Sequence, residues 1–106
     1  MKKDTLAIKE IEAVNKKIIG SYSVEVVNFH HYDNSVLLKL EAKDSICAYF
    51  NGYKISFLPF NMSMSIEKTK QFSKDLQKII SIAEQCKKIL TKYGQYEEKR
   101  YDRYKI

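Results

Sequence analysis

The sequence is poor in residues that interrupt regular structure: it has one proline and three glycines in 106 residues, and no tryptophan. This scarcity excludes a low-complexity or disordered chain, and a hydrophobic share of 44% is that of a folded domain. No apolar run reaches the length of a membrane span or a signal-peptide core. We therefore expect one domain over residues 1–94 with a charged tail over 95–106, no membrane partner and a cytoplasmic location.

Candidates for covalent catalysis are equally few. The two cysteines, Cys47 and Cys86, lie among apolar residues, where a thiol acts as a small hydrophobe and where no histidine stands nearby to activate it. A reducing compartment also argues against a disulfide. The glycines are isolated at Gly20, Gly52 and Gly94, so no phosphate-binding loop is present. We predict that the protein is not an enzyme and has no catalytic residue.

A metal site is not expected either. His30 and His31 stand close to Asp33, but neighbouring residues of a strand point to opposite faces and rarely reach one ion. Asp33 followed by Glu41-Ala42-Lys43 resembles the acid…Glu-x-Lys pattern of restriction-type nucleases. Those two carboxylates would lie about 25 Å apart along the chain, too far to share a metal. We predict no metal and no cofactor.

The net charge of +6 is unevenly distributed along the chain. It amounts to +2 over residues 1–20, −1 over 21–61, +4 over 62–94 and +1 over 95–106. Within the most basic segment, Lys70, Lys74 and Lys78 are spaced by four and line one side of a helix. Such a side binds nucleic acid or an acidic partner, or is a solvated surface. We take these three lysines as candidate partner-binding residues.

Two helices are predicted at the ends of the domain. Ile8, Ile11, Val14 and Ile18 recur at helical spacing, which predicts a helix from Thr5 to Ile19. After Ser65, a good N-cap, an apolar stripe follows heptad spacing to Tyr93. The stripe consists of Thr69, Phe72, Leu76, Ile79, Ala83, Cys86, Leu90 and Tyr93.

Between these helices the pattern changes to alternation, which is typical of strands. We predict strands over Ser21–Phe29, Val36–Ala42, Ile46–Phe50 and Tyr53–Leu58. The first is expected to be central, or covered on both sides near its end, because Val27 and Phe29 add apolar bulk to its second face. The predicted fold is α+β: an N-terminal helix, a four-stranded antiparallel meander and a long C-terminal helix (αββββα).

The clearest local signal is Asn51-Gly52 between the last two predicted strands. Asn-Gly favours a two-residue hairpin turn, because both central positions need positive φ. This turn predicts that Phe50 pairs with Tyr53, Ala48 with Ile55, and Ile46 with Phe57, all on one apolar face.

The second helix is long for the sheet beside it. Its length of about 43 Å exceeds the roughly 20 Å of a six-residue strand, so it either breaks near Ser81 or packs on something else. We expect a homodimer in which the C-terminal halves of two such helices meet. The dimerisation residues would be Ala83, Cys86, Ile89, Leu90 and Tyr93.

The tail adds a second candidate partner-binding surface. It interleaves tyrosine with arginine, residue types enriched at protein hot spots and able to stack on bases. A frayed helix end is the alternative interpretation. The candidate partner-binding residues here are Arg100, Tyr101, Arg103 and Tyr104.

The junction of the last strand with the second helix resembles two groups of proteins. Lys54–Ser65, leading into Phe72 and Leu76, is similar to the strand-to-helix joint of single-strand-binding transcriptional coactivators. Its Ile-Ser-Phe-x-Pro-Phe strand end, before a Ser-capped helix, looks like that of small phage and mobile-element accessory proteins. That second resemblance implies an inhibitor of host machinery such as a CRISPR nuclease, working in the host cytoplasm.

We therefore expect a non-catalytic interaction protein, with another protein or a ribonucleoprotein complex as its partner. The alternative is a single-stranded nucleic-acid-binding module that uses the basic second helix and the aromatic tail.

Overall fold

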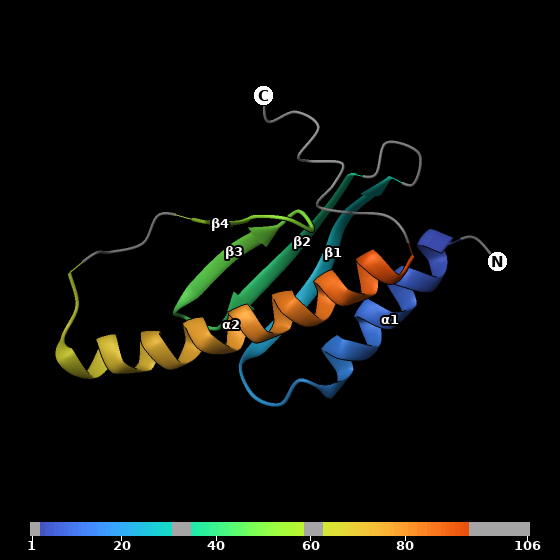
Figure 1. Cartoon of the computed structure of the whole chain (residues 1–106). Coiled ribbons are helices and arrows are strands. Elements are labelled where there is room, and N and C mark those ends of the chain that lie inside the picture. Colours follow the sequence, from blue (N-terminus) through green and yellow to red (C-terminus); the bar gives the residue numbers. More distant parts are fainter. Residues whose placement is uncertain (1–2, 31–34, 59–62, 94–106) are drawn as a thin grey trace, which may run out of the picture.

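A computed structural model of the chain describes residues 3–30, 35–58 and 63–93. The sheet order is β1-β2-β3-β4 with every neighbouring pair antiparallel, so the predicted helix–meander–helix fold of the α+β class is confirmed (Figure 1). The elements are α1 (Lys3–Lys17), β1 (Tyr22–His30), β2 (Ser35–Ala42), β3 (Ile46–Phe50), β4 (Ile55–Phe57) and α2 (Ile66–Lys92).

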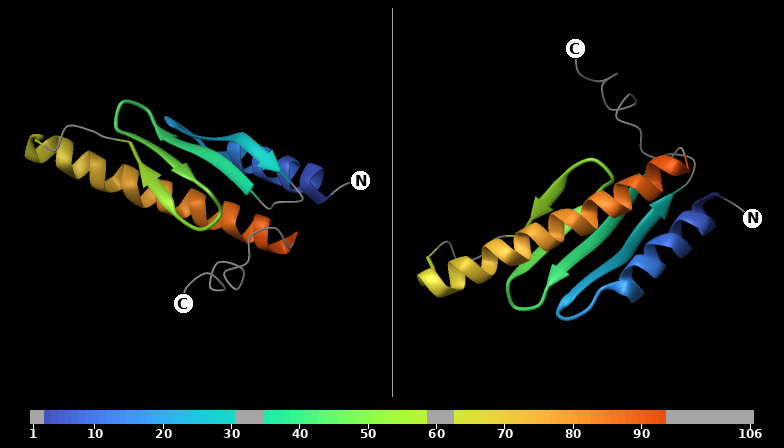
Figure 2. Two further views of the ribbon diagram at one scale, coloured as in Figure 1. Left: turned by 90° about the horizontal axis from the view of Figure 1, so that it is seen from above. Right: turned by 60° about the horizontal axis from the view of Figure 1, so that its bottom comes forward.

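The molecule has two layers, because both helices pack on the same face of the sheet (Figure 2). In β2 and β3 every second side chain is buried, among them Leu38, Leu40 and Ala48. The side chains between them, such as Lys39 and Tyr49, are only half-buried and form the open face of the sheet. Strict alternation on the two central strands thus reflects a sheet that is covered on one side.

The expectation that the first strand is central is wrong, since β1 is an edge strand. A β-bulge between Val26 and Asn28 leaves Val27 without a partner on β2 and 51% exposed. The extra residue returns Phe29 to the helix-facing side, where it packs against the core. Val27 and Phe29 are therefore a bulge and a core residue, not the second apolar face of a central strand.

The predicted β3–β4 hairpin forms, but its turn and register differ from the prediction. Phe50 pairs with Ile55 and Ala48 with Phe57, so β4 is displaced by two residues along β3. The N–H of Asn51 donates to the carbonyl of Lys54 at 3.2 Å, which places Gly52 and Tyr53 at the tip.

The cause is the Asn51 side chain. Its Oδ1 accepts the backbone N–H groups of Tyr53 and Lys54 at 2.9 and 2.7 Å, so Asn51 closes the turn instead of occupying it. Only Gly52 then needs positive φ, and its φ is 92°. A displacement of two keeps each side chain on its predicted face, so Ala48 and Ile55 do share a face.

Helix α2 runs unbroken through Ser81 and lies diagonally across the sheet, with α1 antiparallel beside its C-terminal half (Figure 1). The premise of the predicted dimer is therefore wrong. Ala83, Cys86 and Leu90 are at most 4% exposed within one chain, and Ile89 packs against the same core. The exposed end is the opposite one: the first turns of α2 extend beyond the sheet, and Ile66 is 74% exposed.

Candidate functional site

The three lysines predicted on α2 all lie on its exposed side. Lys70, Lys74 and Lys78 are exposed, while Asp75 and Ile79, each directly after one of these lysines, are buried. The helix is fixed in this orientation by its buried stripe, and its start is fixed by Ser65, whose hydroxyl accepts the N–H of Lys68 at 3.2 Å. The core thus determines which side of the helix presents the lysines.

The positive charge of the molecule is concentrated in the helix layer. Over the described helix-layer residues 5–19 and 63–93, ten lysines stand against five acidic residues, a net charge of +5. Over the described sheet-layer residues 20–30 and 35–58, three lysines stand against three acidic residues, a net charge of zero. We call the outer side of α1 and α2 the lysine surface. Its exposed lysines are Lys9, Lys16, Lys17, Lys70, Lys74, Lys78, Lys88 and Lys92, whereas Lys87 is half-buried and Lys68 lines a depression beside the sheet.

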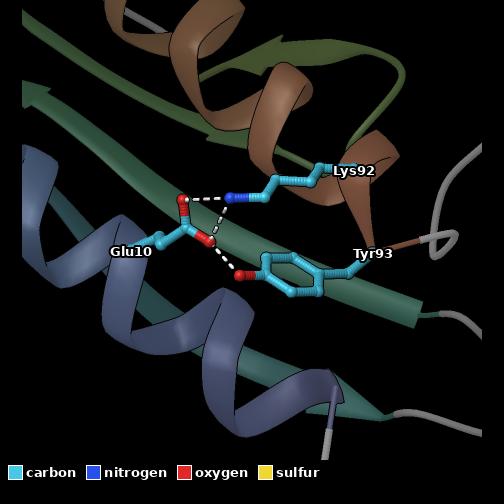
Figure 3. Close-up of polar contacts among 3 residues, drawn as sticks. All are labelled: Glu10, Lys92 and Tyr93. Carbon is cyan, nitrogen blue, oxygen red and sulfur yellow. Dashed lines mark hydrogen bonds and ion pairs between the residues drawn. The ribbon is translucent and has the colours of Figure 1, made fainter.

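One acid–base cluster ties the two helices together at the end of the lysine surface (Figure 3). Both carboxylate oxygens of Glu10 accept Lys92 Nζ at 3.2 Å, and Oε2 also accepts the Tyr93 hydroxyl. Hydrogen bonds from Tyr93 and Lys92 lower the pKa of Glu10, and the bond to Glu10 raises the pKa of Tyr93. Tyr93, predicted to contact a second chain, instead binds a glutamate of its own chain.

A second polar cluster lies under the sheet and was missed by sequence reasoning. Asp75 is 5% exposed and accepts the Tyr22 hydroxyl at 2.7 Å and Gln71 Nε2 at 3.0 Å. Burial acts to raise the pKa of Asp75, but hydrogen bonds from Tyr22, Ser45 and Gln71 outweigh it and lower the pKa. The available signal was an aspartate four residues before Ile79, inside the apolar stripe.

Two open depressions of about 290 and 270 Å³ flank the turn between β2 and β3. Asp44 and Ser45 line both, and Asp44 adopts a φ of 61°. On the helix side the remaining charged lining residue is Lys68. That depression is thus lined by one carboxylate and one ammonium, whereas the other is lined by the two carboxylates of Glu41 and Asp44, so neither has the positive charge of the lysine surface.

The cysteines differ in their surroundings. Both are free thiols. Burial raises the pKa of Cys86 to about 12, which keeps it protonated and unreactive at neutral pH. Cys47 is half-buried on the open face of the sheet.

Several predicted positions lie outside the described residues. These are the tail residues Arg100, Tyr101, Arg103 and Tyr104, together with His31 and Asp33. His30 ends β1 with an exposed side chain. Across the described ranges, no three histidine, cysteine or acidic side chains gather into a group that could hold a metal ion. No helix within those ranges is both long and apolar enough to span a membrane.

Comparisons with protein-family descriptions, with curated proteins and with solved structures return no match to this chain.

Proposed function

We propose that this chain is a non-catalytic interaction protein that binds an acidic surface of another protein through its lysine surface. The observation that carries the proposal is the charge difference between the layers, +5 on the helix layer and zero on the sheet layer. A field of one sign on one face attracts a partner of the opposite sign and orients its approach. The helices are held rigidly by the core, so these charges are presented in a fixed arrangement.

A protein partner fits this surface better than a single-stranded nucleic acid does. Binding to single strands relies on exposed aromatic side chains that stack on bases. Among the described residues of the helix layer the aromatic side chains are Phe72 and Tyr93. Phe72 packs against the core. Tyr93 is also engaged, since its hydroxyl donates to Glu10 and Lys92 Nζ lies over its ring, 5.2 Å from the centroid.

The resemblance to phage accessory proteins gives a narrower form of the proposal, in which the partner belongs to a host nuclease complex such as a CRISPR nuclease. This form stays a prediction. Its direct test is whether the purified chain reduces target cleavage by such a nuclease.

The proposal is tested by capture from a lysate of the native host with three versions of the full chain, followed by quantitative mass spectrometry. The first version is wild type, and the second replaces Lys70, Lys74 and Lys78 by glutamine. The third is the matched control, which replaces the three described lysines of the sheet layer, Lys39, Lys43 and Lys54. Both triple variants lose the same charge. Lys39 pairs with Glu41 at 3.7 Å on the surface, a contact that contributes little to stability.

We expect one protein to be recovered by wild type and by the sheet-layer variant, and to be lost with the α2 variant. Recovery should survive nuclease treatment of the lysate. Loss after nuclease treatment would point to the nucleic-acid alternative. Equal recovery by all three versions would show that the lysine surface is only solvated.

A further inference from the structure

The two edges of the sheet are protected differently. At the β1 edge, α1 packs along the strand, and Asn15 Oδ1 accepts the outward N–H of Val24 at 3.0 Å. The exposed Glu25 follows on the same strand. A covering helix, a capped backbone group and a charge are the usual means by which proteins prevent pairing at an edge.

The β4 edge has no covering helix among the described residues, and its exposed charge, Lys54, stands one residue before the strand and not on it. The bonds from Asn51 N–H to Lys54 and from Leu58 N–H to the Cys47 carbonyl fix which groups face β3. By alternation, the N–H and C=O groups of Ile55 and Phe57 face away from the sheet. In the described part of the chain α2 packs over β1, β2 and β3 but not over β4.

The side chains at this edge are neutral and mostly apolar from Ile55 to Leu58. Phe57 and Leu58 are each 43% exposed, and Ile55 is half-buried. An exposed, uncharged strand with unpaired backbone groups is a template for another strand.

We propose that β4 pairs with β4 of a second copy of this chain, antiparallel, about a two-fold axis through Ser56. The register follows from which groups face outward. Ile55 would pair with Phe57 of the other copy, and Phe57 with its Ile55, as two hydrogen-bonded pairs that supply four backbone hydrogen bonds.

The side chains fit this register on both faces. On the helix side each isoleucine meets a phenylalanine, a favourable cross-strand combination. On the open face the two Ser56 residues meet as a non-hydrogen-bonded pair, in which the Cα atoms approach to about 4.5 Å. Small hydroxyl side chains suit that short distance. The strand is therefore complementary to itself, which is why a second copy is the occupant we infer.

Pairing of this kind would join two four-stranded sheets into one of eight strands. Because the axis is perpendicular to the sheet, both helix layers lie on the same side, and two lysine surfaces face the same way. The ladder has only three residues and is followed by Pro59 in the sequence, which has no N–H to extend it. The association is therefore weak and concentration-dependent. It does not depend on the proposed function, because β4 carries none of the lysine surface.

The first test is sedimentation equilibrium of the full chain from about 10 μM to about 1 mM. Wild type should pass from monomer to dimer over this range. Ser56→Lys puts two ammonium groups face to face at the axis and should weaken dimerisation at least tenfold. The matched control is Ser23→Lys, which makes the same change on the open face of β1 and should leave dimerisation as in wild type. A monomer at every concentration, or a dimer that Ser56→Lys does not weaken, would overturn the proposal.

The second test is disulfide formation in a Cys47→Ser background, which removes the half-buried thiol. Ser56→Cys should form a cross-linked dimer on mild oxidation, since the Cα distance of such a pair lies in the range of a disulfide. Ser23→Cys should stay monomeric. Equal cross-linking of the two variants would mean random collision and would contradict the two-fold axis at Ser56.

Discussion

At the scale of single residues, the buried Asp75 shows how one polar group joins the layers of the molecule. It sits on α2 and accepts a hydrogen bond from Tyr22 of β1, fifty-three residues away in the sequence. A buried carboxylate stays charged only where hydrogen bonds replace the water it loses. Tyr22, Ser45 and Gln71 supply those bonds, so the position of α2 over the sheet depends on them.

Replacing Tyr22 by phenylalanine should therefore weaken the fold. Loss of a hydrogen bond to a charged group is worth about 1.5 kcal/mol of unfolding free energy at neutral pH. Urea denaturation measures it. The control is Tyr49→Phe on the open face of the sheet, which should leave the unfolding free energy unchanged.

The same variant should alter the acid dependence of stability. The folded-state pKa of Asp75 lies below its ordinary value, so its stabilising contribution is complete above the ordinary value and is lost as the pH falls through the folded one. Tyr22→Phe reduces that pKa difference. Wild type should therefore lose more unfolding free energy than the variant as the pH is lowered from neutral into the acid range. An identical loss in the two proteins would show that the Tyr22 bond does not hold the pKa down.

Gly52 lies at the tip of the β3–β4 hairpin, where the backbone conformation favours glycine. Its φ of 92° is strained for a β-branched residue, so Gly52→Val should lower the unfolding free energy by about 1.5 kcal/mol. Gly52→Asn should lower it less, because asparagine tolerates positive φ. Thermal unfolding of both variants measures the difference. Equal effects would show that the hairpin tip adjusts to either residue.

At the scale of elements, alternation and heptad spacing predicted three strands and both helices to within a few residues, because each of them has one buried side. The fourth strand, β4, has no buried residue and was found from the Asn51-Gly52 turn signal. What those patterns could not predict is which element covers which. The spacing from Ala83 to Leu90 predicts that this side of the helix is buried, but it does not predict what buries it. In the structure the sheet and α1 of the same chain do so. The predicted hairpin register was wrong because the sequence does not show which role Asn51 takes. An asparagine can occupy a central position of the turn, or it can close the turn through its side chain, as it does here.

The position of Leu90 allows a direct test of this arrangement. Leu90 is fully buried within one chain, so Leu90→Glu should unfold the monomer and not merely separate a dimer. The expected loss of unfolding free energy is about 4 kcal/mol, from lost apolar packing and a buried charge. Lys88→Glu on the exposed side of the same helix should change it by no more than about 0.5 kcal/mol. Circular dichroism during urea denaturation distinguishes the two, and a fully folded Leu90→Glu monomer would contradict the packing.

At the scale of the whole molecule, the sequence predicted the lysine positions but not the separation of charge between layers. That separation exists because both helices pack on one face of the sheet, a fact of topology that linear charge counts do not contain. The Glu10–Lys92 pair and the Tyr22–Asp75 bond were hidden for the same reason, since their partners lie 82 and 53 residues apart in the sequence.

The tail remains a separate candidate surface for the whole protein. Deleting residues 95–106 should leave the unfolding transition unchanged, because the described core, which runs from Ile11 to Leu90, already joins both helices to the sheet. It should weaken partner binding if Arg100, Tyr101, Arg103 and Tyr104 contact the partner. Full binding by the shortened chain would assign the tail no role, and failure to fold would make it structural.

The central claim is that the lysine surface binds an acidic partner, and it is tested most directly by the affinity of the captured partner at two salt concentrations. Titration calorimetry should be run with wild type, the Lys70/Lys74/Lys78 glutamine variant and the Lys39/Lys43/Lys54 glutamine variant. We predict that the α2 variant binds at least tenfold more weakly and that its affinity changes less with salt, because screening acts on the charges it lacks. The sheet-layer variant should match wild type in both respects. Equal weakening of the two variants would contradict the account, since net charge alone, and not the face that carries it, would then govern binding.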